Sequence, residues 1–250
     1  NLYLFRRNEN IDLVMDHVQP DIVFHLAGNP LIKTDDLEGL LSDNTWLTRR
    51  ILVGMKKDSR IVFASSAAVY GDYAGHPFSE THPTNPTAIY GYSKLLSEKL
   101  IETYALAGKI KCSILRLGAN VGPGATHGVL KDLLYKYHNN DVLEIIGDAP
   151  GSSKPYTYVK DTVKALTLAA DKELDGIYNV AVSDNISVSG MAYRILHRFG
   201  EKELKWLGEG ANWKGDNRTV KVENYKIKQA GWSPAYDTSS GAINAAIGAS

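Results

Sequence analysis

Short apolar runs alternate with segments of helical periodicity along most of the chain. Apolar runs rich in β-branched residues predict buried strands at 21–28, 60–66, 111–118, 142–148 and 176–182. Apolar positions at helical spacing predict helices at 44–57, 88–108, 129–140, 159–170 and 187–200. Strands that alternate with helices of this length are typical of a parallel α/β sheet.

Three of these strands end in residues that could serve a ligand. The first runs out through His25 to Gly28, the second ends at Ser65 and Ser66, and the third ends at Arg116 to Gly118. Ligands of open parallel sheets bind at the carboxyl ends of the strands, so these ends should share one sheet edge.

Tyr90 and Lys94 lie in the first turns of the helix between the second and third of these strands. Residues four apart share a helix face, so both side chains could meet Ser66. The chain has 14 tyrosines, and about one Tyr/Lys pair at this spacing is expected by chance. A second pair, Tyr156 and Lys160, falls in the strand-like stretch "PYTYV" without a matching serine, and we discard it.

A serine, a tyrosine and a lysine in this arrangement favour one kind of chemistry. Free tyrosine has a pKa of about 10 and is a poor base at neutral pH, but a nearby ammonium favours the phenolate. The serine hydroxyl could orient a substrate oxygen. Together the three could remove a hydroxyl proton while hydride leaves the same carbon, which requires an acceptor such as a nicotinamide.

Composition narrows the class of protein further. Lys plus Arg and Asp plus Glu both number 28 in 250 residues, and a zero net charge argues against nucleic-acid binding. No apolar run approaches the ~20 residues of a membrane span, and the N-terminal residues do not resemble a signal peptide. Cys112 is the only cysteine and lies in an apolar run, so we expect core packing, a reducing cytoplasmic setting and no metal site. His25 is also expected to pack at its strand end.

Several linked motifs resemble the extended short-chain dehydrogenase/reductases, in particular their nucleotide-sugar epimerase/dehydratase group. The most specific are "VFASSAAVYGD" (62–72) and "PTNPTAIYGYSK" (83–94). The resemblance runs from about residue 11 to the C-terminus. It includes "PDIVFHLAGNP" (20–30), "ILRLGANVGPG" (114–124), "LEIIGD" (143–148), "KPYTYVKD" (154–161), "NWKGD" (212–216) and "AGWSPAYD" (230–237).

This resemblance implies a Rossmann-like doubly wound parallel sheet with a smaller C-terminal α/β substrate domain. The NAD-binding domain would comprise 1–118 and 157–182, and the substrate domain 119–156 and 183–250. It also implies NAD as cofactor, a nucleotide sugar such as a UDP-hexose as substrate, and a homodimer through helices 44–57 and 88–108. Members of the family begin with a strand, a glycine-rich turn and a helix, but this chain has no glycine before Gly28. We therefore expect roughly 50 N-terminal residues of the fold to be missing from the sequence in hand, with a true truncation as the alternative.

The resemblance also implies roles for individual residues. Ser66, Tyr90 and Lys94 match the catalytic hydroxyl, the general acid/base and its partner. Cofactor-binding positions would be Leu26, Ala27, Gly28, Asn44, Ala64, Ser65, Tyr90, Lys94 and Leu117. Substrate-binding positions would be Ser66, Ala67, Tyr90, Ala119, Asn120, Gly128, Val129, Glu144, Ile146, Lys154 and Arg218.

Two departures from the family pattern affect the predicted reaction. Dehydratases carry an Asp-Glu pair after the catalytic hydroxyl, whereas this chain has Ala67 and Ala68, so dehydration is disfavoured. Many members place an asparagine where this chain has Ala119, and Asn120 is the next residue along. The glycines of "GPGATHG" (122–128) resemble a dinucleotide fingerprint, but their spacing is one residue too long and Pro123 interrupts them, so a substrate loop is the better interpretation. His127 in that loop either reaches substrate phosphates or is solvated.

The leading hypothesis is an NAD-dependent nucleotide-sugar epimerase of the UDP-glucose/UDP-galactose 4-epimerase type, acting by transient oxidation at sugar C4. A nucleotide-sugar oxidoreductase or decarboxylase of the same family is an alternative. A non-catalytic protein that binds sugar nucleotides is a third hypothesis, if the chain is truly truncated. Trp206 and Trp213 could line the sugar pocket or fill the small domain.

Overall fold

The chain forms two compact units in the computed structural model, which describes residues 4, 10–30, 36–72, 75–208 and 218–249. Unit 1 comprises Asn1–Gly71, Pro83–Arg116 and Leu166–Tyr178, and unit 2 comprises Asp72–His82, Leu117–Ala165 and Asn179–Ser250. The "NWKGD" motif and Trp213 lie outside the described residues.

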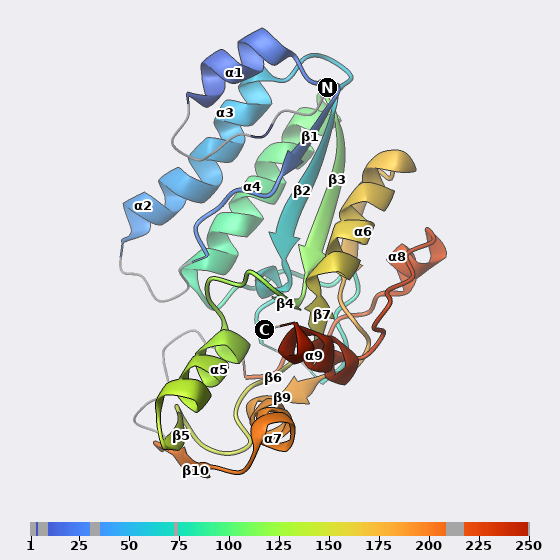
Figure 1. Ribbon diagram of the computed structural model, residues 1–250. Coiled ribbons are helices and arrows are strands. Elements are labelled where there is room, and N and C mark those ends of the chain that lie inside the picture. The colour runs from blue at the N-terminus through green and yellow to red at the C-terminus, as the bar shows by residue number, and fades with distance from the viewer. Residues whose placement is uncertain (1–3, 5–9, 31–35, 73–74, 209–217, 250) are drawn as a thin grey trace. The chain divides into compact units, whose positions relative to one another are not determined.

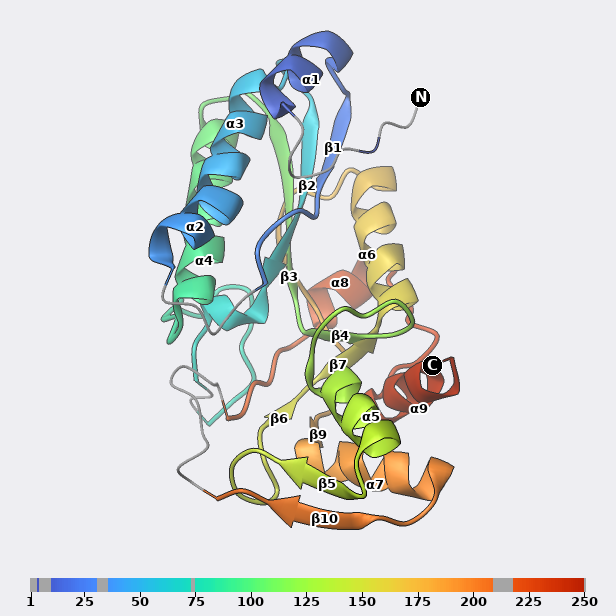
Figure 2. The same ribbon diagram turned by 60° about the vertical axis from the view of Figure 1, so that its left-hand side comes forward.

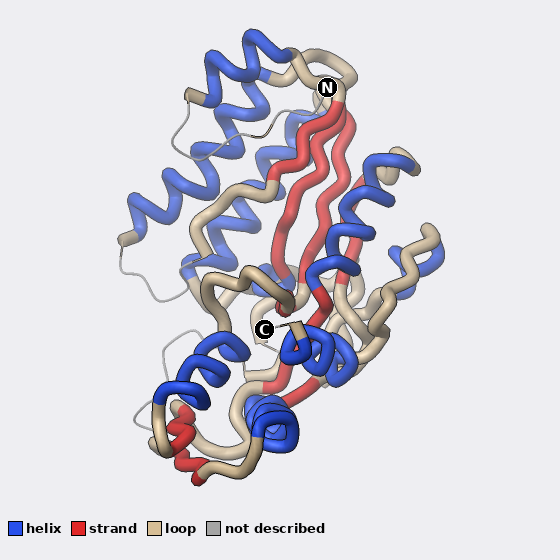
Figure 3. Tube along the Cα trace, viewed as in Figure 1, coloured by secondary structure: helices blue, strands red, loops and turns tan. Residues whose placement is uncertain are grey.

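β1, β2, β3 and β8 form a four-stranded sheet, with the strands in that order. These strands span Ile22–His25, Arg60–Ser66, Lys111–Leu117 and Gly176–Val180, and Figure 3 shows the first three side by side in red. β1 pairs in parallel with β2, with Ile22 opposite Arg60. Ile22 and Phe24 on this edge strand are 43% and 41% exposed, whereas Ile61, Val62 and Phe63 on the neighbouring strand are fully buried.

Helices cover one face of this sheet. They are α1 (Ile11–Val18), α2 (Leu37–Leu41), a π-helix (Ser42–Trp46), α3 (Leu47–Gly54) and α4 (Ile89–Leu106), and Figures 1 and 2 show α1 to α4 stacked against β1 to β3. The core between the two layers includes Met15, Ile51, Phe63, Ile101 and Ile114. The helix expected at 44–57 therefore begins as a π-helix, and α1 is an element that the apolar pattern did not predict.

Unit 2 is built from three small two-stranded sheets and several helices. β4 (Ala119–Val121) and β7 (Tyr156–Tyr158) are parallel, as are β5 (Val142–Ile145) and β10 (Glu203–Trp206), while β6 (Ser153–Lys154) and β9 (Ile186–Ser187) are antiparallel. The helices are α5 (Val129–Asn139), α7 (Val188–Phe199), α8 (Tyr225–Gln229) and α9 (Ser239–Gly248). α6 (Val159–Asp171) follows β7 directly. Leu133, Leu143, Met191, Ile195 and Ile243 belong to the unit's apolar core.

This architecture confirms the expected α/β, Rossmann-like fold. The strands predicted at 60–66 and 111–118 and the long helix predicted at 88–108 are present within two residues of the expected bounds. Among the described residues, no helix is long and apolar enough to cross a membrane. In the same part of the chain, His, Cys, Asp and Glu side chains form no cluster that could hold a metal ion.

Candidate active site

The end of β2 and the first turn of α4 bring Ser66 and Tyr90 together. β2 ends at Ser66, whose hydroxyl oxygen accepts a hydrogen bond from the backbone N–H of Ala68 at 3.2 Å and so starts a short 3₁₀ turn. The Ser66 hydroxyl also lies close enough to the phenol of Tyr90 to lower the pKa of that phenol. A Cβ atom on Gly91 would lie 2.7 Å from the carbonyl oxygen of Ala68. The close approach of helix and turn therefore requires glycine beside the tyrosine.

Lys94 lies one turn further along α4 and is anchored to the same strand. Its side chain is 5% exposed, and Nζ donates to the carbonyl oxygen of Ala64 at 3.0 Å. The ammonium also lies 4.9 Å from the centre of the Phe63 ring. A Cβ atom on Gly28 would lie 3.2 Å from Nζ, so the loop after β1 passes directly beside the lysine. Structure thus brings Ser66, Tyr90 and Lys94 together, with Gly28 and Ala64 next to them.

Burial governs the ionisation of both titratable members of this group. Burial raises the pKa of Tyr90, and the nearby Ser66 hydroxyl offsets part of that rise. Burial lowers the pKa of Lys94 to about 8, against the opposing influence of the Glu98 carboxylate. Sequence reasoning predicted a lowered pKa for the tyrosine. The difference arises because the phenol is desolvated and the lysine ammonium is directed at the Ala64 carbonyl.

Asn44 fastens the loop after β1 to α4. Its Oδ1 accepts from the backbone N–H of Asn29 at 2.6 Å, and its Nδ2 donates to the Asn29 carbonyl at 3.2 Å and to Ser93 Oγ at 2.9 Å. The residue is 2% exposed and lies in the π-helix, a distortion often found at functional sites. The resemblance implied a cofactor contact here, and the structure shows the side-chain amide bonded to protein atoms that flank Gly28 and Lys94.

His25 is buried at the end of β1, as expected from the sequence. Its Nε2 hydrogen-bonds to Thr48 Oγ1 at 2.8 Å, and its Nδ1 has no partner within the described chain. Burial, together with the charge of Lys94, lowers the pKa of His25 to about 3. The imidazole is therefore neutral at physiological pH and adds no charge near the lysine.

The predicted substrate residues of unit 2 lie on separate elements. Asn120 is exposed at the centre of β4, and its Oδ1 accepts from Thr162 Oγ1 at 2.6 Å, while Ala119 pairs with Tyr156 of β7. Gly128 precedes the first turn of α5 with φ of 107°, and Val129 begins that helix. Glu144 lies on β5 and forms an ion pair with Lys205 at 3.4 Å, and Ile146 follows with 43% exposure.

Two candidate cationic ligands of a diphosphate lie on adjoining segments of unit 2. Lys154 is half-buried on β6, and the backbone N–H of its neighbour Ser153 donates to the carbonyl of Arg218 at 2.7 Å. Arg218 is exposed. The structure therefore brings the two segments together although 64 positions separate them in sequence.

The remaining predicted positions differ in exposure: Leu26 is 55% exposed, Leu117 is half-buried, and Ser65 and Ala67 are buried.

Sequence reasoning missed the role of Glu98. This buried glutamate accepts hydrogen bonds from Ser65 and Arg116, at the ends of β2 and β3. A signal was present, since Tyr90, Lys94 and Glu98 follow one another at four-residue intervals on one face of a helix.

The residues around Gly28 fit the nicotinamide end of a dinucleotide. Gly28 has no side chain to block approach to the Lys94 ammonium, and Lys94 uses only one of its donors on Ala64 in the contacts described above. A Rossmann-like sheet with a serine at the end of a strand, and a tyrosine and a lysine in the first turns of the helix that follows, is typical of the short-chain dehydrogenases/reductases. The sequence profile of the NAD dependent epimerase/dehydratase family matches residues 3–181, and the chain belongs to this family, whose cofactor is NAD.

Similar proteins include epimerases and a decarboxylase of UDP-sugars. A protein of Methanocaldococcus jannaschii that bears the provisional name UDP-glucose 4-epimerase is 29% identical over 248 residues, which are 94% of this chain and 79% of that protein. The UDP-N-acetyl-alpha-D-glucosaminuronate decarboxylase of Bacillus cytotoxicus is 32% identical over 203 residues, covering 76% of this chain and 61% of that enzyme. The crystal structure of Thermus thermophilus UDP-glucose 4-epimerase with NAD has a TM-score of 0.85 at 22% identity, covering 95% of this chain and 80% of that one.

Proposed function

We propose that the protein is an NAD-dependent epimerase that inverts C4 of a UDP-hexose, of the UDP-glucose/UDP-galactose type. The observation that carries this proposal is the convergence of Ser66, Tyr90 and Lys94, with alanines directly after the serine. Those alanines matter because they supply no acid to protonate a leaving hydroxyl, which a dehydratase requires. Ser66, Tyr90 and Lys94 can transfer one proton at one substrate oxygen. Epimerisation by transient oxidation requires this proton transfer and no further acid.

In the proposed mechanism, Ser66 and Tyr90 act on the same substrate oxygen. Ser66 Oγ hydrogen-bonds to the sugar 4-hydroxyl, and Tyr90 accepts the proton of that hydroxyl in the oxidation and returns it in the reduction. Lys94, held by the Ala64 carbonyl, is proposed to supply a positive charge that opposes the rise in the Tyr90 pKa caused by burial and so favours the phenolate when substrate is bound. NAD would be held beside Gly28 and Lys94, where it would supply the hydride acceptor and donor that epimerisation at C4 requires. The side chains of Lys154 and Arg218 are proposed to bind the diphosphate as cations.

The test is the interconversion of UDP-hexoses by the purified chain. The protein is incubated with NAD and UDP-galactose, and the products are separated by anion-exchange chromatography and identified by proton NMR. We expect UDP-glucose to form without net NADH, because the cofactor ends as it began. Tyr92→Phe serves as a matched control, since Tyr92 is on the same helix but 50% exposed. Absence of both bound NAD and UDP-hexose interconversion would refute the proposal, and binding of UDP alone would favour a non-catalytic binding protein.

A second candidate reaction is oxidation or oxidative decarboxylation of a UDP-uronate. The specific observation in its favour is the 32% identity with the Bacillus cytotoxicus decarboxylase, which is higher than that with the provisional archaeal epimerase. The same trio would remove the proton of the 4-hydroxyl. Release of carbon dioxide from a UDP-uronate, or net formation of NADH absorbing at 340 nm, would replace the epimerase proposal with this one.

We also propose that the protein is a homodimer that buries the exposed apolar side chains of the π-helix, α3 and α4. Trp46 is 53% exposed, Val53 60% and Leu96 48%. Leu96→Glu should convert the dimer to a monomer, because it places a charge in an apolar interface. Light scattering coupled to size-exclusion chromatography measures the mass. Leu207→Glu is the control, since Leu207 is 44% exposed and follows β10, away from these helices in sequence. A wild-type monomer at micromolar concentration contradicts the proposal.

A further inference from the structure

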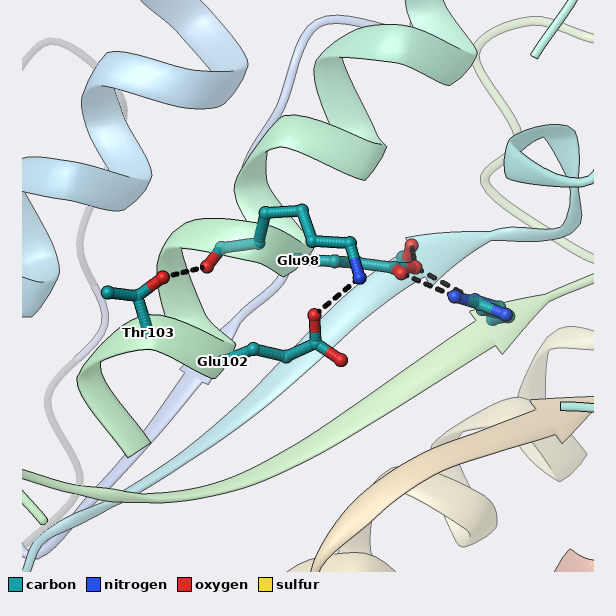
Figure 4. A network of polar contacts seen from close by, with 6 residues as sticks. Glu98, Glu102 and Thr103 are labelled. Carbon is teal, nitrogen blue, oxygen red and sulfur yellow. Dashed lines mark hydrogen bonds and ion pairs between the residues drawn. The ribbon is translucent and has the colours of Figure 1, made fainter. Parts of the chain in front are cut away.

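A buried carboxylate that the proposed mechanism does not use lies one helical turn beyond Lys94. Glu98 is completely buried on α4. Figure 4 shows it pointing from the helix toward the strands, where dashed lines mark its contacts. Its Oε1 accepts from Ser65 Oγ and from Arg116 Nε at 3.0 Å, and its Oε2 accepts from Arg116 Nη2 at 2.7 Å. Both oxygens are therefore bound by groups at the ends of two strands.

Arg116 completes this buried ion pair from β3. Its side chain is 3% exposed, and its guanidinium lies 4.7 Å from the centre of the Tyr70 ring. Replacing a buried ion pair with apolar residues often leaves stability unchanged or improves it, so stability alone does not account for the pair. The contacts of the neighbouring residues indicate a different role.

Three consecutive residues at the end of β2 lie against three successive turns of α4. The Ala64 carbonyl accepts from Lys94, the Ser65 hydroxyl donates to Glu98, and the Ser66 hydroxyl lies near the phenol of Tyr90. A shift of the strand against the helix would therefore move Ser66 away from Tyr90. Among these bonds, only the one from Ser65 to Glu98 connects the strand to a third element, because Glu98 also holds Arg116 of β3.

We propose that Glu98 is a positioning residue, which holds the ends of β2 and β3 against α4 and places its negative charge one helical turn beyond Lys94. This proposal rests on the proposed function, because it assigns Glu98 to the site formed by Ser66, Tyr90 and Lys94. Glu98 has no direct contact with Ser66 or Tyr90, the two residues that would act on the substrate hydroxyl. It acts through its hydrogen bond with Ser65 and through its negative charge.

Among the described residues, charged or titratable groups around Lys94 come from α4, β1 and β3. On α4 the lysine faces Tyr90, which is neutral, and Glu98, which is negative. On β1 it faces His25, whose pKa of about 3 makes it neutral, and from β3 comes Arg116, which is bound to Glu98. Glu98 raises the pKa of Lys94 against the larger effect of burial. Removing the negative charge should therefore lower that pKa, and an uncompensated Arg116 should lower it further.

The experiment is a titration of Lys94 in the purified full chain. Lysine side chains are labelled with ¹³C at Cε, the Lys94 signal is assigned with Lys94→Arg, and its chemical shift is followed with pH. We expect a midpoint near pH 8 in the wild type and a midpoint lower by about one pH unit, a tenfold change in proton affinity, in Glu98→Gln. Arg116→Gln should move the midpoint in the opposite direction, because it leaves the glutamate charge uncompensated.

Two further variants separate positioning from general damage to the fold. Glu102→Gln changes the next glutamate of α4, which binds Lys99 at 2.7 Å, and should leave the Lys94 midpoint unchanged. Ser65→Ala removes one hydrogen bond and should lower kcat by up to about tenfold with KM unchanged, and Ser65→Thr should restore it.

The outcomes distinguish this inference from the proposed function. Equal Lys94 midpoints in the wild type, Glu98→Gln and Arg116→Gln overturn the positioning role. If Glu98→Gln fails to fold, the Arg116→Gln midpoint decides the question, and an upward shift supports the role. Opposite shifts in a chain that converts no UDP-hexose support the role of Glu98 and overturn only the proposed reaction.

Discussion

Replacing Tyr90 with phenylalanine should lower kcat by about 10³-fold, within the range of 10² to 10⁴ that a positioned acid/base contributes. The substitution removes only the phenolic oxygen, which lies near the Ser66 hydroxyl and would exchange a proton with the sugar hydroxyl. The ring remains to fill its place at the start of α4. KM should change little, because the interaction lost is one made in the transition state.

The measurement is the steady-state rate of UDP-hexose interconversion with NAD present. Tyr92→Phe removes a hydroxyl two positions away on the same helix, where the side chain is half exposed, and should retain the wild-type rate. Binding of NAD and UDP by the Tyr90→Phe protein, followed by calorimetry, shows whether the site remains formed. A Tyr90→Phe protein with more than a tenth of wild-type kcat would show that another group transfers the proton.

Replacing Asp161 with alanine should destabilise unit 2 by about 2–5 kcal/mol, since it leaves two backbone N–H groups without a partner. The carboxylate of this completely buried residue accepts from the N–H groups of Ala235 at 2.8 Å and Tyr236 at 3.1 Å, and it pairs with Lys164 at 2.9 Å. The carbonyl of Asp161 also accepts from Trp232 Nε1 at 2.8 Å. The residue thus ties the start of α6 to the segment before α9, and its role is structural.

The same contacts set the pH dependence of this contribution. Burial alone would raise the pKa of Asp161, but hydrogen bonds from Ala235, Lys164 and Tyr236 outweigh it and lower the pKa below 3.8. A lowered pKa in the folded state contributes stability that is fully present above the unfolded pKa and is lost as the pH falls through the folded one. The difference between wild type and Asp161→Ala should therefore persist at pH 7 and shrink below pH 3.8.

Urea unfolding followed by circular dichroism and tryptophan fluorescence measures this difference. Asp171→Ala is the matched control, because Asp171 is the exposed last residue of the same helix and should change the midpoint little. Equal unfolding midpoints for Asp161→Ala and Asp171→Ala at pH 7 would contradict the structural role.

Local patterns sufficed to predict the main strands and helices of unit 1. β2 and β3 are apolar runs rich in β-branched residues, and a strand in the middle of a parallel sheet needs such residues on both faces. The interval between Tyr90 and Lys94 matches one helical turn, so their shared face followed from helix geometry. The sequence did not predict elements such as α1, β6 and β9. These elements are short, or their apolar positions fit helical and strand spacing equally well.

The ionisation of the site depends on burial, which no local pattern reveals. The Lys94 ammonium lies over the Phe63 ring and beside the loop at Gly28, and burial lowers its pKa to about 8. Burial likewise raises the pKa of Tyr90. Desolvation depends on every atom within several ångströms, and those atoms come from strands and loops far apart in sequence.

The sequence by itself determined the α/β class, because apolar runs and helical segments alternate along the chain. Its linked motifs resembled one family, and that resemblance implied the three residues that would carry the proposed reaction. Only the tertiary structure decided what surrounds them. In the folded chain the Asn44 amide hydrogen-bonds to Asn29 and Ser93. Hydrogen bonds also connect Glu98 of α4 to Ser65 of β2 and Arg116 of β3. Hydrogen bonds between distant segments form only where the folded backbone brings donor and acceptor within about 3 Å.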